Sequence, residues 1–135
     1  MRKNLKYFIV GLIALLFLVK DRLFAKQKID LSQIDTNGAN ISDVGAQGIA
    51  DYIHNELKSS FWIEDDNVIN ALKGLNESAL KLVYKKFGYR DLSERHLGIL
   101  EPFYATNTAD LYAWILDVNN QTFTNKFKNI YTWLY

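Results

Sequence analysis

The chain has 135 residues, with 16 lysines and arginines against 15 aspartates and glutamates, and it contains no cysteine. The lack of cysteine excludes disulfide bonds, thiol nucleophiles and cysteine-ligated metals. Residues 1–28 hold seven basic residues and one acidic residue, and residues 29–135 hold the remaining nine basic and fourteen acidic residues, a net charge of −5. An acidic body is poorly suited to nucleic acids, because affinity for them comes from neutralising phosphates.

An uncharged, apolar run of thirteen residues, Tyr7–Val19, follows the basic residues Arg2, Lys3 and Lys6. Thirteen helical residues rise about 20 Å, less than the roughly 30 Å of a hydrocarbon core, so the length alone is also compatible with a cleavable signal peptide. The charged residues at 20–22 occupy the place where a cleavage site requires small side chains. Snorkelling lysines and arginines extend the helix over Leu5–Phe24, which is long enough to span a bilayer.

The sequence therefore predicts three parts. Residues 1–28 are a transmembrane anchor with basic flanks, residues 29–42 are a polar linker, and residues 43–135 are one all-α domain. Because basic residues lie on both sides of the apolar run, the positive-inside rule leaves the orientation of the anchor open.

Helical periodicity predicts the elements of the body in chain order. The first helix spans about 43–59, with Ser42 as its N-cap, and the second begins in the acidic cluster 64–66. Asn76 caps the third helix, which ends at Gly88. A short fourth helix from about Asp91 stops before Pro102.

Thr106 or Thr108 is expected to cap a fifth helix that turns Leu111, Tyr112, Ile115 and Leu116 inward. After Asn119 and Asn120, apolar residues recur at helical spacing and predict a sixth, amphipathic helix, with a strand as the alternative. The residues of this apolar stripe are Phe123, Phe127, Ile130, Tyr131 and Leu134.

Residues 46–118 resemble a single annexin repeat. The likeness rests on the segments GIADYIHNELKSSF, IEDDNVINALKGL and NESALKLVYKKFG, and on the Arg90-Asp91-Leu92 that follows Phe87-Gly88. The resemblance implies a compact five-helix superhelical bundle, to which the chain adds an anchor and a C-terminal aromatic helix.

Annexins bind calcium through a glycine-rich loop between the first two helices and a later carboxylate. The corresponding loop here, 58–63, has no glycine and carries Phe61 and Trp62. Glu101 lies 39 residues after Trp62 and is the candidate for a remnant calcium carboxylate. Without a glycine to expose several carbonyls to one cation, the expectation is the fold without a metal or other cofactor.

An anchor followed by one annexin-like repeat is also similar to the layout of small membrane proteins of lipid-containing bacteriophages and related bacterial elements. This resemblance implies a bacterial inner membrane or a virion membrane as the location.

Candidate catalytic groups are weakly supported by the sequence. His54 and His96 have no metal-ligand spacing around them, and Glu77 with Glu101 has no accompanying sugar-site signature of a glycosidase. The acidic cluster 64–66 is typical of a helix N-terminus.

Two groups of residues are predicted to contact a partner or the membrane. The first is the only basic cluster of the body, and the second comprises aromatic residues that lie off the helical stripes and are therefore expected to be exposed. With the loop aromatics, the predicted interface residues are Phe61, Trp62, Lys85, Lys86, Arg90, Trp133 and Tyr135.

These observations predict a non-enzymatic, single-pass membrane protein that links a lipid bilayer to a protein assembly such as a capsid or an envelope layer. Two alternatives remain open: a peripheral envelope enzyme such as a wall hydrolase, and a calcium- and lipid-binding annexin-like module.

Overall fold

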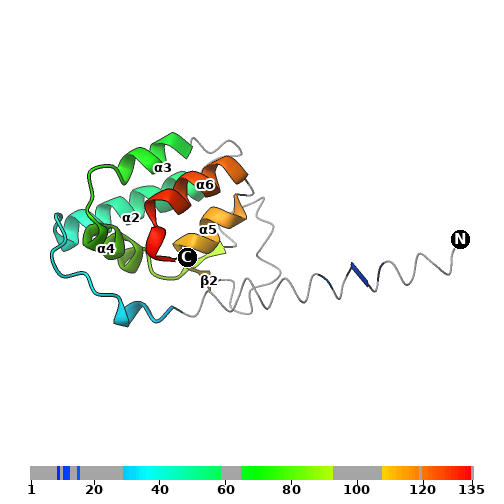
Figure 1. Ribbon diagram of the computed structural model, residues 1–135, viewed down its shortest axis with the longest axis horizontal. Helices are drawn as coiled ribbons and strands as arrows, with labels where there is room; N and C mark the ends of the chain where they lie inside the picture. Colours follow the sequence, from blue (N-terminus) through cyan, green and yellow to red (C-terminus); the bar gives the residue numbers. More distant parts are fainter. Residues whose placement is uncertain are drawn as a thin grey trace, which may run out of the picture.

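The computed structural model describes residues 29–58, 65–92, 108–118 and 120–134, together with Ile9, Gly11, Leu12 and Leu15 of the N-terminal segment. Within these ranges the body is built from helices, with one two-residue strand pair (Figure 1). The predicted all-α class is confirmed at this level. In the part of the chain that is described, no helix combines the length and the apolar character needed to cross a bilayer.

The first three helices of the body follow the sequence prediction closely. Helix α2, Asp43–Lys58, begins after Ser42, whose Oγ accepts a hydrogen bond of 3.1 Å from the amide of Gly45. Helix α3 spans Asp65–Ala71 and begins inside the predicted acidic cluster. Packing of α2 against α3 and α4 buries the predicted apolar faces, and the fully buried residues of α2 and α3 are Ala46, Ala50, Ile53, Leu57 and Val68.

Helix α4, Glu77–Phe87, has the caps that the sequence predicts. The side chain of Asn76 accepts a hydrogen bond of 2.9 Å from the amide of Ala79. Gly88 ends the helix with a φ of +62°, in the left-handed region where a side chain would be strained, and its amide donates to the carbonyl of Tyr84.

The chain after α4 differs from the prediction. Arg90–Asp91 forms strand β1, which pairs antiparallel with strand β2, Thr108–Ala109, so a helix does not begin at Asp91. The rest of the predicted fourth helix and Thr106 lie outside the described residues.

Asp110, not a threonine, caps helix α5, Leu111–Asp117, by accepting a hydrogen bond from the amide of Ala113. The prediction of a threonine cap was wrong because Thr108 is used in the strand pair. The buried face of α5 is broader than one stripe: Leu111, Ala113, Trp114 and Ile115 are all fully buried, whereas Tyr112 and Leu116 are half-buried.

The last predicted helix is confirmed, and the strand alternative is wrong. Helix α6, Gln121–Ile130, is capped by Asn120 and buries Phe123 and Phe127. It ends four residues earlier than the apolar stripe suggests. Tyr131 is fully buried beyond the end of the helix, and a 3-10 turn, η4, spans Thr132–Leu134.

Residues 29–42, predicted as a polar linker, pack along the body. They include a 3-10 turn, η1, Leu31–Gln33, and Ile34 is only 9% exposed. Ile29, Leu31, Ala39 and Ile41 pack against the core. In Figure 1 this segment follows one edge of the body up to the start of α2, and α3 lies at the opposite edge. We call residues 29–42 the strap.

Candidate functional site

The basic cluster at the end of α4 is engaged largely by acidic residues of α2. Arg90 Nη2 lies 2.7 Å from Asp51 Oδ1, and Lys86 Nζ lies 3.0 Å from Asp43 Oδ2. The hydrogen bond from Arg90 holds the pKa of Asp51 below its ordinary value. These two ion pairs join α4 and the chain after it to α2, so part of the predicted binding charge is used within the body.

Arg90 is tied to the core by three further contacts. Its Nε donates to the carbonyl of Phe87 at 2.9 Å, and its guanidinium lies 4.8 Å from the centre of the Phe87 ring. Its own carbonyl accepts a hydrogen bond of 3.2 Å from the indole of Trp114.

Lys85 is half-buried, and the described part of the chain provides no acidic partner for it.

Trp133 packs on the core, contrary to the expectation that it is exposed. Its ring lies 5.5 Å from that of Tyr84 in an edge-to-face arrangement and 6.3 Å from that of Tyr131. Lys81 Nζ lies 5.5 Å from the centre of the Trp133 ring. The expectation failed because it continued the helical stripe past Ile130, whereas the turn after α6 redirects the chain and brings Trp133 onto α4.

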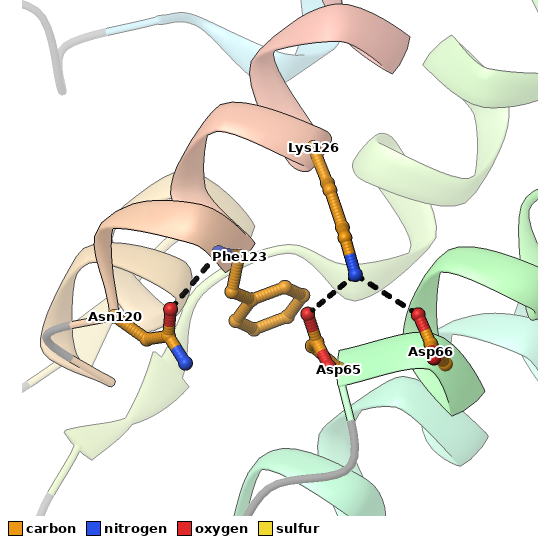
Figure 2. Close-up of polar contacts among 5 residues, drawn as sticks. All are labelled: Asp65, Asp66, Asn120, Phe123 and Lys126. Atoms are coloured by element: carbon orange, nitrogen blue, oxygen red, sulfur yellow. Dashed lines mark hydrogen bonds and ion pairs between the residues drawn. The ribbon is translucent and has the colours of Figure 1, made fainter.

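The acidic cluster at the start of α3 is bound by a lysine of α6 (Figure 2). Lys126 Nζ lies 3.0 Å from Asp65 Oδ2 and 3.0 Å from Asp66 Oδ1. The hydrogen bonds that the Lys126 ammonium donates to both carboxylates raise the pKa of Lys126. One turn earlier in α6, the buried Phe123 points its ring toward the start of α3, beside these ion pairs. The cluster therefore links α3 to α6.

Asp110 is a buried carboxylate that the sequence reading did not single out. It is 1% exposed; Oδ1 accepts a hydrogen bond of 3.0 Å from the amide of Ala113, and Oδ2 makes no well-formed hydrogen bond with the described residues. Burial raises its pKa, and the hydrogen bond from the Ala113 amide, together with the nearby Tyr84 hydroxyl, partly opposes that rise. Burial, followed by the nearby charge of Asp110, also raises the pKa of Tyr84.

This pair of buried polar groups is placed for packing rather than for reaction with a solute. Tyr84 is fully buried between Tyr131 and Trp133, with ring centres 5.7 and 5.5 Å away. A signal for Asp110 was available in the sequence, because an aspartate followed by an apolar helical pattern is a common N-cap.

Of the remaining candidate residues, His54 has described contacts. His54 is half-buried and lies edge-to-face with Trp114 at 5.0 Å. Among the described residues, no three histidine or acidic side chains are grouped closely enough to hold a metal ion. The other candidates, Phe61, Trp62, His96, Glu101 and Tyr135, lie outside the described residues.

Asn40 and Tyr89, which hold the strap, were also missed, as was the second role of the predicted cap Asn76. Asn40 Nδ2 donates to the carbonyl of Gly74 at 2.9 Å, and Asn40 Oδ1 accepts from the amide of Asn76 at 3.1 Å. Asn76 in turn donates from Nδ2 to the carbonyl of Gly38 at 2.8 Å. At the other end of the strap, the hydroxyl of Tyr89 donates to the carbonyl of Ile29 at 3.0 Å.

The chain matches no protein-family model, no curated protein and no solved structure.

Proposed function

We propose that the chain is a non-enzymatic, single-pass membrane protein that tethers a lipid bilayer to a protein assembly. The observation that carries this proposal is the uncharged run Tyr7–Val19 between basic flanks, followed directly by a small helical body. A minor membrane protein of a lipid-containing phage virion is the specific form that the resemblance in layout favours, and a bacterial envelope layer is its cellular counterpart.

The polar contacts of the body support a structural role, because the polar side chains with the clearest contacts stabilise the fold itself. Asn76, Asp110 and Asn120 cap helices, and Lys126 joins α3 to α6. The strap connects the predicted anchor to the core without a free stretch after Ile29. Such a connection holds the body, and any protein bound to it, at a fixed distance from the membrane.

The net charge of −5 over residues 29–135 indicates the chemistry of the protein partner. An acidic body is attracted to a basic surface and repelled by other acidic ones, which favours a capsid or envelope protein with a basic inner face. The annexin-like bundle remains part of the proposal as the form of the domain.

Chemical crosslinking of the intact assembly tests the tether. The full-length chain is expected to crosslink to one abundant layer protein, and the chain without residues 1–28 is expected to bind that protein but to lose the membrane. Crosslinks to lipid-embedded proteins alone would contradict the role in joining two layers. Release of soluble sugar fragments from purified peptidoglycan by the full-length chain would favour the wall-hydrolase alternative instead.

A further inference from the structure

The strap is bound at both ends of helix α4. Near the end of α4, the hydroxyl of Tyr89 donates to the carbonyl of Ile29. At the start of α4, the Asn40 side chain accepts from the amide of Asn76, and the Asn76 side chain donates to the carbonyl of Gly38. Between these points Ile34 is buried in the core. The chain is therefore docked on the body from Ile29 onward. The strap does not act as a spacer, and the body stays close to the end of the predicted anchor.

The distance from the predicted membrane span to the strap is short. Five peptide units separate Phe24, the last residue of the predicted span, from Ile29, and they reach at most about 17 Å when fully extended. The headgroup layer on one side of a bilayer is about 5–8 Å thick. Ile29 and the Tyr89 side chain bound to it therefore lie within the headgroup layer or no more than about 12 Å beyond it.

The exposed groups at this place suit a headgroup layer. Tyr89 is a large aromatic side chain that is 48% exposed, and tyrosine is enriched where a membrane meets water. The exposed side chains of the strap are polar, with carboxylates at Asp30 and Asp35. Lys26 and Lys28 precede them in the sequence. The positive charge of these lysines offsets the repulsion between the carboxylates and anionic phospholipid headgroups.

We propose that the strap and Tyr89 form the membrane-facing side of the body, seated against phospholipid headgroups, and that α3, at the opposite edge in Figure 1, faces away from the bilayer. This inference rests on the proposed anchor. It turns a general tether into an oriented one, in which the edge formed by α3 and the Lys126 ion pairs is presented to the protein layer.

Single-cysteine labelling tests the orientation, and the absence of cysteine from the chain makes each label unique. The full-length variants Tyr89→Cys and Asn70→Cys, an exposed position of α3, would each carry an environment-sensitive fluorophore. They would be reconstituted in vesicles of phosphatidylcholine and phosphatidylglycerol containing a lipid with a nitroxide on its headgroup. Quenching is expected to be several-fold stronger at position 89 than at position 70.

A label at Lys85→Cys, in the last turn of α4, leaves the hydroxyl bond of Tyr89 in place and is expected to be quenched like position 89. Equal quenching at all three labels overturns the oriented arrangement. Failure of the full-length chain to float with the vesicles would instead refute the anchor on which it rests.

Discussion

Trp133 shows at the scale of one residue how a short turn changes the role of a side chain. Its ring packs against Tyr84 and Tyr131 and lies under Lys81, so it covers the core at the C-terminal end. A half-buried aromatic in this position contributes both burial and ring contacts to stability.

Replacing Trp133 by alanine is expected to lower the free energy of unfolding by about 2 kcal/mol, less than for a fully buried tryptophan. Tyr52→Ala is the matched control, since Tyr52 is an exposed aromatic of α2 and should change stability by roughly 0.5 kcal/mol or less. Urea denaturation of the three proteins measures both changes. Equal small effects would mean that Trp133 is a surface residue after all.

Asp110 gives a prediction with a definite sign in pH. Burial raises its pKa in the folded protein above the ordinary value of 3.8, so the folded state binds its proton more tightly than the unfolded state. Its contribution to stability is fully present below the unfolded pKa and is lost as the pH rises through the folded pKa.

The variant Asp110→Asn keeps an oxygen that can accept from the Ala113 amide and removes the ionisation. The stability of the wild type relative to this variant should therefore fall as the pH rises above about 4 and then level off. Denaturant titrations of both proteins across that range provide the test. A difference that stays constant, or that grows with pH, would show that Asp110 does not titrate as a buried acid.

At the scale of elements, the helices with strong local signals were the most predictable. Helices α2 and α4 carry a side-chain cap and an apolar face of the right period, and both begin within a residue of their predicted starts. The sixth helix was predicted for the same reason, although its end depends on how Tyr131 packs. The start of α5 was misplaced because the pairing of 90–91 with 108–109, a long-range contact without a local signal, uses Thr108, and because the cap signal of Asp110 was overlooked.

The candidate site was less predictable than the fold. Nothing local identifies the acidic partners of Arg90 and Lys86, because both lie in α2, about forty positions earlier in the chain. Likewise, the strap is polar in sequence and reads as a linker, whereas its few apolar residues, such as Ile34, are placed by the tertiary structure.

The strap also makes a testable contribution to stability. Asn40→Ala removes two side-chain hydrogen bonds to 74–76 and should lower the free energy of unfolding by about 1 kcal/mol. Asn37→Ala is the control, because the described residues provide no hydrogen-bond partner for the side chain of Asn37. Thermal unfolding of both variants distinguishes a docked strap from a free linker, for which the two substitutions would have the same small effect.

At the scale of the whole molecule, the calcium-binding alternative predicts a different response from the tether. We expect millimolar calcium to leave the melting temperature of the full-length chain unchanged, because the loop 58–63 has no glycine to expose carbonyls to a cation. A ligand at 100 times its dissociation constant would add about 2.7 kcal/mol and raise the melting temperature by several degrees. Calorimetry with calcium, and with magnesium as the control, detects a rise of that size, which would restore the calcium module.

The tether, the oriented body and the resemblance in layout all depend on residues 1–28 remaining in the bilayer as an anchor. Intact mass spectrometry of the chain recovered from membranes floated after alkaline extraction is the most direct test of this claim. The account predicts the full 15.6 kDa chain in the floated fraction. A shorter chain beginning near Lys26, or the full chain in the extracted soluble fraction, would contradict it.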